Sequence, residues 1–268
     1  MDLRIGTKTA IVTGASAGIG LAIAREFAEN GVNLVLVARR ATGLSEAAKE
    51  IGNRFAVEVL PLAADVGSPD EPDRVVASAL ERFGSVDILV NNAGRASAGG
   101  IMAASESEWE EMTATKLSAM RRFCRAVIPH MRQRHWGRIV SISSIGGIYP
   151  NFRLMVSHAL SAAINNLTRS IALEVARDGI LVNAIGVGAV LTDNWANNML
   201  PAVRQARPEL ANQSDEAIVK RLGEEMTPVG RFGTPEEIAA ITVFLASDRN
   251  GFITGHTVEA SGGADRFM

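Results

Sequence analysis

Three observations in the sequence predict a single-domain α/β fold, in which helices cover both faces of a doubly wound parallel sheet. Short apolar runs of strand length alternate with amphipathic stretches of helix length along most of the chain. These runs are mainly apolar, which is typical of strands buried on both faces. The chain has 268 residues, of which 47% are hydrophobic, and can therefore bury one sizeable core. We expect one domain over residues 1–268.

The first three elements form a β-α-β unit. Residues 9–13 are predicted to be a short buried strand, residues 19–30 a helix that ends at Gly31, and residues 33–38 a second strand. Further strands are expected at 57–63, 86–91, 138–143 and 180–186. Because helices separate the strands, right-handed crossovers should place them parallel in one sheet.

A polar, helix-rich insertion at residues 192–227 interrupts this alternation. Long connections beyond strand ends are often lids over a substrate site, and we expect that role here. Trp195, Met199 and Leu200 lie in this segment. They fit two interpretations: an apolar substrate pocket, or packing of the segment onto the domain.

Composition and charge exclude several classes of protein. The 27 basic and 29 acidic residues are dispersed and give a net charge of −2, so a nucleic-acid partner is not expected. The single cysteine, Cys124, cannot form an internal disulfide and has apolar neighbours, which fits a reducing compartment. The first apolar run is too short for a signal sequence or a membrane span. We expect a soluble, cytoplasmic protein that does not bind membranes.

A glycine-rich turn follows the first predicted strand and opens the first helix. Its glycines are Gly14, Gly18 and Gly20, a spacing that differs from the commoner dinucleotide fingerprint. Glycine permits a tight turn and a close approach of the backbone to a pyrophosphate, and the free N–H groups of a helix N-terminus face the anion. Glycines also serve ordinary turns, but the strand-turn-helix context favours a dinucleotide site.

Together with Asn91, Asn92, Ala93 and Gly94 after a later strand, this turn resembles the motifs of the short-chain dehydrogenase/reductase family, whose members have an NAD(P)-binding Rossmann domain. Further matches are Asp65 and the segments 137–144, 182–188, 235–239 and 253–255. The resemblance covers nearly the whole chain. It implies a set of cofactor-binding residues beyond the three glycines: Ser16 and Ile19 along the phosphates, Asp65 and Val66 at the adenine, Asn91, Ala93 and Gly94 under the adenine ribose, and also Gly188 and Thr192.

Two of these motifs have simpler explanations that stay open. Asp65 would serve equally well as a helix cap. Asn91 and Asn92 would serve equally well to turn the chain.

The end of the second strand decides between the two nicotinamide dinucleotides. An acidic residue there would bind both hydroxyls of the adenosine ribose and repel a 2′-phosphate. This sequence instead has Arg39 and Arg40, and a guanidinium can pair with a phosphate. NADP(H) is therefore favoured over NAD(H), the alternative being that both arginines are simply solvated.

The catalytic residues are where the sequence departs from the family. Family members use a Tyr that exchanges a proton with the substrate oxygen, a Lys four residues later that lowers its pKa and holds the nicotinamide ribose, and a Ser that polarises the same oxygen. Ser144 fills the Ser position, but the family spacing then leads to Ser157 in place of Tyr and Ser161 in place of Lys. Lys116 stands where family members have an Asn that supports a water. No metal is expected.

Ser157 cannot simply replace a tyrosine, because an aliphatic hydroxyl is a far weaker acid than a phenol with a pKa near ~10. Three other side chains are possible substitutes: Tyr149, His158 and Lys116. Lys116 has the most favourable expected geometry, since it would project an ammonium toward the vacated space. Each also has an ordinary alternative role, in loop packing, at a helix interface or in solvent respectively.

Three functions remain open on these observations. We favour an NADP(H)-dependent oxidoreductase that acts on a carbonyl or alcohol substrate through a relocated proton donor. The double loss of Tyr and Lys favours a catalytically silent nucleotide-binding protein. The third is a non-redox enzyme, such as a lyase or isomerase, that uses Ser144 and Lys116 on the same scaffold. Serine at both positions is also what deliberate inactivation of an active enzyme would leave.

Self-association is the last expectation. The predicted helix over 157–176 is rich in small residues, which permit close approach of a second helix. Family members associate through this helix, its predecessor and the C-terminal strand. The resemblance therefore implies a homodimer or homotetramer with Phe252, Phe267 and Met268 as contact residues, the alternative for the tail being a loose terminus.

Overall fold

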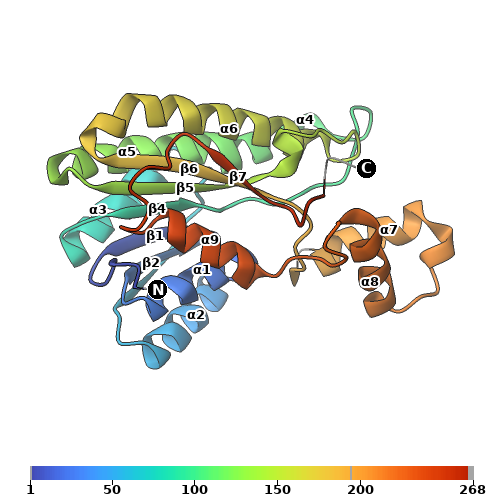
Figure 1. Cartoon of the computed structure of the whole chain (residues 1–268), viewed down its shortest axis with the longest axis horizontal. Coiled ribbons are helices and arrows are strands. Elements are labelled where there is room, and N and C mark those ends of the chain that lie inside the picture. The colour runs from blue at the N-terminus through green and yellow to red at the C-terminus, as the bar shows by residue number, and fades with distance from the viewer. Residues whose placement is uncertain (1, 194, 265–268) are drawn as a thin grey trace.

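Seven parallel strands form one sheet in the computed structural model, which describes residues 2–193 and 195–264. Their order is β3-β2-β1-β4-β5-β6-β7 (Figure 1). The bounds are β1 (Thr9–Thr13), β2 (Asn33–Ala38), β3 (Val59–Ala63), β4 (Ile88–Asn91), β5 (Gly137–Ser144), β6 (Ile180–Val187) and β7 (Thr257–Ala260). The strand order reverses at β1, so the predicted doubly wound fold class is confirmed.

All six strands predicted from apolar runs are present, with small differences at their ends. The strands expected at 57–63 and 86–91 begin two residues later, at Val59 and Ile88. Those expected at 138–143 and 180–186 are slightly longer, at Gly137–Ser144 and Ile180–Val187. β7 has no continuous apolar run, and it forms because β6 offers it a free edge.

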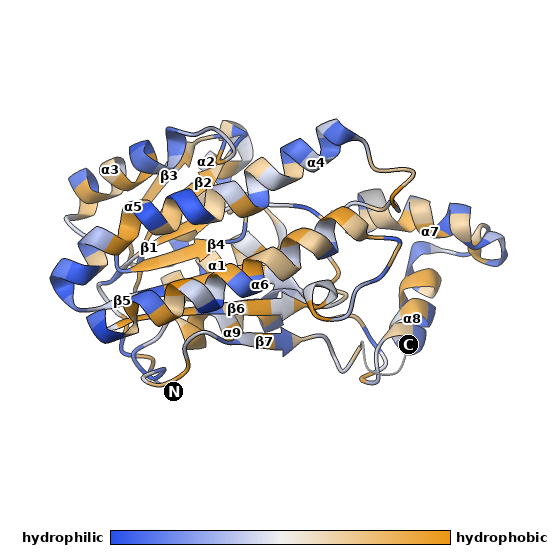
Figure 2. Cartoon of the chain, turned by 90° about the horizontal axis from the view of Figure 1, so that it is seen from above, coloured by the Kyte–Doolittle hydropathy of each residue, from blue (hydrophilic) through white to orange (hydrophobic). Residues whose placement is uncertain are grey.

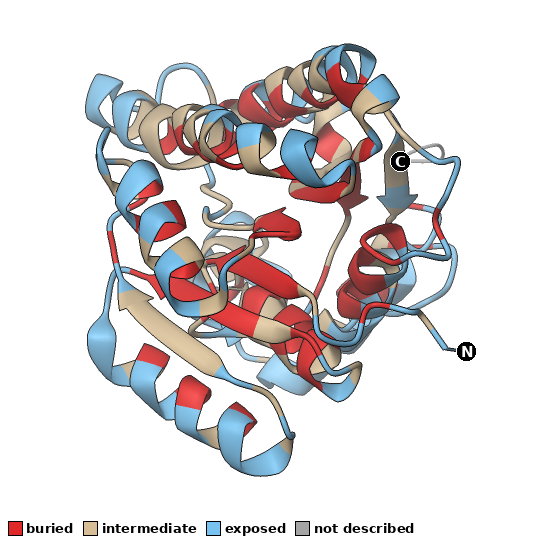
Figure 3. Cartoon of the chain, turned by 90° about the vertical axis from the view of Figure 1, so that its left-hand side faces the viewer, coloured by how far each residue is buried: buried red, intermediate tan, exposed pale blue. Residues whose placement is uncertain are grey.

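Helices cover both faces of this sheet (Figure 3). On one face lie α1 (Gly18–Glu29), α2 (Ala41–Arg54) and α9 (Pro235–Leu245). On the other lie α3 (Glu71–Phe83), α5 (Ala119–Arg134) and α6 (Met155–Val175). The buried residues of each helix face the strands, so the core consists of two apolar layers separated by the sheet.

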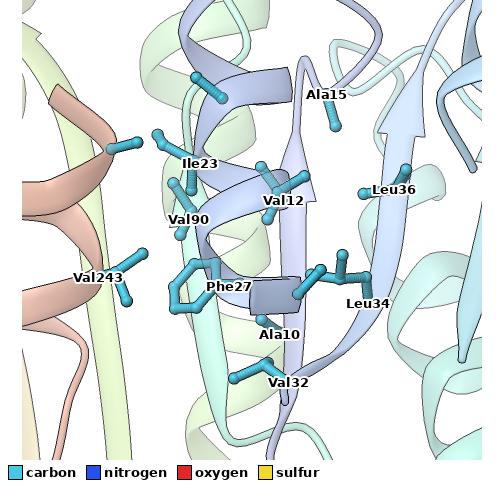
Figure 4. Close-up of a cluster of buried hydrophobic side chains, with 14 of the residues drawn as sticks. Ala10, Val12, Ala15, Ile23, Phe27, Val32, Leu34, Leu36, Val90 and Val243 are labelled. Carbon is cyan, nitrogen blue, oxygen red and sulfur yellow. The ribbon is translucent and has the colours of Figure 1, made fainter. Parts of the chain in front are cut away.

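The layer under α1 shows how the strand pattern builds this core. Ala10 and Val12 point to the same side of β1 and lie in one cluster with Phe27 of α1 and Val243 of α9 (Figure 4). Ile11, between them, points to the other side and belongs to the opposite cluster. Phe27 is fully buried, which contributes about 1.5–3 kcal/mol to stability. This packing fixes the start of α1 relative to the end of β1.

The segment 192–227 forms a small helical unit beyond the carboxyl ends of the strands (Figures 1 and 2). It contains α7 (Leu200–Ala206) and α8 (Asp215–Met226). Leu200 is buried in a separate apolar cluster, and the Trp195 ring meets the Phe232 ring edge-on at 4.6 Å between centroids. Both residues therefore belong to a cluster that the segment shares with Phe232, which lies just beyond it. A lid function of this segment remains a prediction.

No described helix is both long enough and apolar enough to span a bilayer.

Candidate active site

A cleft of about 510 Å³ opens beside β1, where the strand order reverses. Its walls come from the segments that follow β1, β2, β3 and β4, together with α4 (Glu106–Met112) and the π-helical turn η1 (Thr113–Ser118). The lining residues are Gly14, Ser16, Ala38, Arg39, Arg40, Ala64, Asp65, Val66, Ala93, Gly94, Arg95, Glu111, Met112, Thr115 and Lys116. Clefts at this place in doubly wound folds bind ligands.

The glycine-rich turn has the backbone that the sequence predicts. Gly14 and Gly18 have φ values of +68° and +55°, which residues other than glycine rarely adopt. A Cβ at Gly20 would collide with the carbonyl oxygen of Gly14 and would lie 2.5 Å from Nδ2 of Asn92. The N-cap of α1, Ala17, makes no side-chain cap, so the first N–H groups of the helix remain for a ligand. These features fit the pyrophosphate of a dinucleotide.

Hydrogen bonds join this turn to the segment after β4. Thr13 Oγ1 accepts from the backbone N–H groups of Asn92 and Ala93, at 2.9 and 3.0 Å. In return, Nδ2 of Asn92 donates to the carbonyl oxygens of Thr13 and Gly14. The carboxyl ends of β1 and β4 therefore form one rigid floor for the cleft.

The side chain of Asn91 points away from the cleft that Ala93 and Gly94 line. Its Nδ2 lies 3.4 Å from Ser141 Oγ and 3.8 Å from Cys124 Sγ, so the side chain points into the fold. Ala93 and Gly94, by contrast, line the cleft, and their place under an adenine ribose stays a prediction. Burial raises the pKa of the Cys124 thiol to about 12, which makes this cysteine a structural residue.

At the adenosine end of the predicted site, Asp65 and Val66 both line the cleft. Oδ1 of Asp65 accepts from the backbone N–H of Gly67 at 3.0 Å, which forms a local turn. Because α3 begins at Glu71, Asp65 does not cap that helix. Its exposed position in the wall leaves it free to contact an adenine.

Two guanidiniums and one carboxylate meet across the cleft. Arg39, after β2, lies 3.9 Å from Glu111 of α4, and Glu111 lies 3.3 Å from Arg95. Arg95 also lies 4.0 Å from Glu108. Sequence reasoning selected Arg39 but missed Glu111 and Arg95, because no motif connects them; only the folding of α4 over the cleft brings them to Arg39.

The remaining predicted cofactor residues lie close to the turn but outside the lining of the cleft. The methyl group of Thr192 faces Gly18, where a Cβ would lie 3.6 Å from Thr192 Cγ2. Gly188 packs against Ser261, since a Cβ on it would lie 2.7 Å from the Ser261 Cα. Ile19 packs against the core beneath the turn.

Lys116 reaches the other end of the cleft because the helix around it is irregular. Its backbone belongs to the π-helical turn η1, which separates α4 from α5 and changes the direction of the side chains that follow. Nζ of Lys116 donates to Oγ of Ser157 at 3.3 Å, across 41 positions of sequence. The stem packs against Gly94, where a Cβ would lie 2.9 Å from Lys116 Cγ.

Burial lowers the pKa of Lys116 to about 8. No carboxylate compensates its charge, since the ion pairs among residues 2–193 and 195–264 do not include it. A lysine in these surroundings exchanges a proton near neutral pH, as an acid–base group must.

Ser157 and Ser161, which the family resemblance aligns with the catalytic Tyr and Lys, lie on α6, where Ser157 accepts a hydrogen bond from Lys116. Ser157 is 4% exposed and Ser161 is fully buried. Ser161 Oγ donates to the backbone carbonyl of Ser157 at 2.8 Å, one turn earlier in α6. The geometry therefore does not support direct contact of Ser161 with a substrate, while Lys116 lies between Ser157 and the cleft.

Ser144 ends β5, and its hydroxyl accepts from the backbone N–H of Gly146 at 3.1 Å. Its own proton remains available for a substrate oxygen. His158 supports this turn from below: its ring contacts Gly146, and Nδ1 accepts from the Asn151 N–H at 2.9 Å. Burial and then the charge of Lys116 lower the pKa of His158, so it is a neutral, structural residue.

Tyr149, the other considered substitute, faces away from this site. Its hydroxyl lies 3.5 Å from Glu259 Oε1 of β7. Tyr149 is therefore placed for loop packing, its ordinary alternative.

In the described part of the chain, no three or more His, Cys, Asp or Glu side chains come together in a group that could hold a metal ion.

A family model described as short chain dehydrogenase matches residues 8–201. The chain is a short-chain dehydrogenase/reductase. Its similarity to individual members extends over almost its whole length. It is 35% identical over 261 residues to D-beta-hydroxybutyrate dehydrogenase of Rhizobium meliloti (strain 1021), which covers 96% of this chain and 98% of the relative. It is 34% identical to 3-oxoacyl-[acyl-carrier-protein] reductase FabG of Vibrio cholerae, with 97% and 98% covered.

A solved structure agrees with this membership. This short-chain dehydrogenase/reductase superimposes with a TM-score of 0.91 on L-sorbose reductase from Gluconobacter frateurii, whose crystal structure contains NADPH and L-sorbose. The two proteins are 36% identical, and all of each chain is covered.

Proposed function

We propose that this chain is an NADP(H)-dependent oxidoreductase that interconverts a carbonyl compound and its alcohol, with Lys116 as the acid–base group. The observation that carries the proposal is the position of Lys116 on the wall of the cleft, with Nζ held 3.3 Å from Ser157 Oγ. It places one proton-exchanging side chain at the end of the cleft opposite Arg39.

The choice of NADP(H) rests on the end of β2. Arg39 and Arg40 line the cleft there, and no acidic residue follows the strand. A guanidinium pairs with a 2′-phosphate through charge-assisted hydrogen bonds. NADPH is bound in the L-sorbose reductase structure, which supports the same preference here.

Two side chains would act on the substrate oxygen, and two serines would support them. When bound, the nicotinamide supplies or accepts the hydride. Lys116 as an ammonium would donate a proton to the carbonyl oxygen during reduction, and its pKa of about 8 makes it a stronger acid than an ordinary lysine. Ser144 would polarise the same oxygen with its free O–H. Ser157 would orient the amine by accepting its hydrogen bond, and Ser161 would hold the backbone of that turn.

Kinetics of the Lys116→Gln variant test this assignment. We expect kcat for NADPH-dependent reduction of ketones and quinones to fall by about 10²-fold or more, the size of a positioned acid–base contribution. NADPH affinity should change little, and Lys220→Gln, which removes an exposed lysine, should behave as the unmodified protein. Equal rates in the Lys116→Gln and Lys220→Gln variants would refute the role of Lys116.

The same assay addresses the silent nucleotide-binding protein. The burial of Ser157 and Ser161 favours that alternative, because neither replaces the lost Tyr and Lys in the cleft. If the unmodified protein binds NADPH but reduces no member of the carbonyl panel, the silent binder is the better proposal.

We further propose a homodimer or homotetramer in the cytoplasm. Leu173 on α6 is 82% exposed and Phe252 is 97% exposed, and burial of such side chains would favour a symmetric partner. Phe267 and Met268, the other expected contact residues, lie outside the described residues. Light scattering at micromolar concentration measures the mass directly, and a monomer would contradict the proposal.

A further inference from the structure

Among the described cations that line the cleft, Lys116 and Arg40 have no acidic partner, and Lys116 is the partly buried one of the two. Arg39 lies beside Glu111, and Arg95 lies beside Glu108 and Glu111. Lys116 has one polar side-chain partner among the described residues, the hydroxyl of Ser157. An amine that is partly buried, uncompensated and open to a cleft is suited to nucleophilic chemistry.

We propose that Lys116 forms a covalent imine with an aldehyde or a small ketone that enters the cleft. This activity does not depend on the proposed oxidoreductase function. It needs no cofactor, only the amine, its neighbouring hydroxyl and a carbonyl compound.

The position of the amine is well defined. The stem of Lys116 lies against Gly94, where even a methyl group would come too close, and Nζ is held by Ser157 Oγ. Met112 and Thr115 line the cleft beside it. A carbonyl compound in the cleft would therefore meet the nitrogen of a side chain that has already lost much of its rotamer freedom.

The electrostatic surroundings favour the neutral amine. Burial lowers the pKa of Lys116 to about 8. His158 on α6 is kept neutral by burial and by Lys116 itself, so it contributes no charge. Glu111 of α4 and Arg95 after β4 face the same cleft, and each is already engaged with the other. A substantial fraction of the amine is thus neutral at pH 8, where an exposed lysine with a pKa near ~10.4 is almost fully charged.

The reaction balances without an oxidant or a reductant. The lone pair of Nζ attacks the carbonyl carbon, a C–N bond forms, and the C=O π electrons move to oxygen. A proton passes from nitrogen to that oxygen, with the Ser157 hydroxyl placed to relay it, and gives a carbinolamine. Protonation of that oxygen and its loss as water leave the C=N bond of the protonated imine, which gives the neutral imine when the nitrogen releases its proton to solvent; hydrolysis reverses the sequence.

Reductive trapping on the unmodified chain tests the proposal. The protein, without added nucleotide, is incubated at pH 7.5 with butanal or 2-butanone and sodium cyanoborohydride, and the modified peptides are mapped by mass spectrometry. The chain has four lysines, Lys8, Lys49, Lys116 and Lys220, so each site is an internal standard for the others. We expect Lys116 to be alkylated at least about tenfold faster than the exposed Lys49 and Lys220, because of its larger neutral fraction.

Two variants sharpen the result. Lys116→Arg should lose the fast modification, while Lys49→Arg should keep it. Alkylation of Lys116 at or below the rate of Lys49 and Lys220 would overturn the proposal.

The outcome is separable from that of the oxidoreductase proposal. A protein that reduces ketones through Lys116 but is not trapped there refutes imine formation alone. A protein that is trapped at Lys116 but neither binds nor oxidises NADPH refutes the oxidoreductase proposal alone.

Discussion

The two ends of the cleft are built from different parts of the chain. At the glycine-rich end, the surface offered to a ligand is backbone, shaped by Gly14 and Gly20 and braced by the hydrogen bonds between Thr13 and Asn92. At the other end, the surface includes the Lys116 side chain of η1, which is held from behind by Ser157 of α6, 41 positions later in the sequence. Backbone geometry tolerates few substitutions, whereas side chains at the second end can be exchanged one by one. The sequence shows the same contrast: its glycine-rich turn resembles the family motif, whereas Ser157 and Ser161 stand at the positions where the resemblance leads one to expect Tyr and Lys.

The largest expected effect comes from exchanging the catalytic end for that of the family. Lys116→Asn alone should lower the rate of ketone reduction by about 10²-fold or more. Adding Ser157→Tyr and Ser161→Lys should restore it, because the space above α6 is then free for the phenol. The double variant that keeps Lys116 should be less active than the triple variant, since Lys116 already covers Ser157 and would repel a second ammonium. NADPH oxidation by the three variants checks this, and an inactive triple variant that still binds NADPH would show that the substrate side has diverged as well.

Changing the backbone at the first end should break binding rather than chemistry. Gly20→Ala places a methyl group against the Gly14 carbonyl and Asn92, and overpacking of this kind costs about 1–3 kcal/mol. We expect NADPH affinity to fall about tenfold or more by titration calorimetry. Gly52→Ala is the matched control, since a Cβ at Gly52 in α2 would meet nothing within 4 Å. Equal affinities for the two variants would contradict the close approach of the turn to the cofactor.

The charge of Lys116 should lower stability in a way that depends on pH. Its pKa is about 8 in the folded protein and about 10.4 when unfolded. Below pH 8 both states are protonated, and the folded state bears the cost of the buried charge. Between pH 8 and 10.4 the unfolded state binds more protons, so stability rises with pH across this window.

Replacement of Lys116 by an apolar residue tests whether the charge of Lys116 lowers stability below pH 8. Lys116→Met should increase the free energy of unfolding by up to about 3 kcal/mol at pH 7, and the gain should shrink as the pH approaches 10. Denaturant unfolding at several pH values measures it, with Lys49→Met as an exposed control. A gain that is independent of pH would mean that apolar packing, not the charge, is responsible.

The smallest expected effect concerns the contact that spans the cleft. Glu111 lies 3.9 Å from Arg39 and competes with a 2′-phosphate for its guanidinium. Both side chains are largely exposed, and such a pair contributes less than about 1 kcal/mol. Glu111→Gln should therefore tighten NADPH binding by no more than about fivefold and leave NADH binding nearly unchanged. Glu110→Gln has the same change in charge on the same helix, and an equal effect there would point to a general electrostatic cause.

The sequence by itself determined the features that depend on neighbours along the chain. Mainly apolar runs located six strands, because burial on both faces leaves that pattern regardless of the partner strand. The glycine spacing after β1, the arginines after β2 and the absence of Tyr and Lys thirteen and seventeen residues after Ser144 were likewise readable without coordinates.

Only the tertiary structure decided how distant side chains meet. The π-helical turn η1 directs Lys116 toward Ser157. The hydrophobic periodicity of residues 113–118 does not predict that turn. The folding of α4 over the cleft sets Glu111 opposite Arg39. The packing of α6 buries Ser157 and Ser161, so that a ligand in the cleft does not reach them. The physical reason is that local patterns report burial and backbone preference, whereas the direction of a side chain depends on which element packs against it.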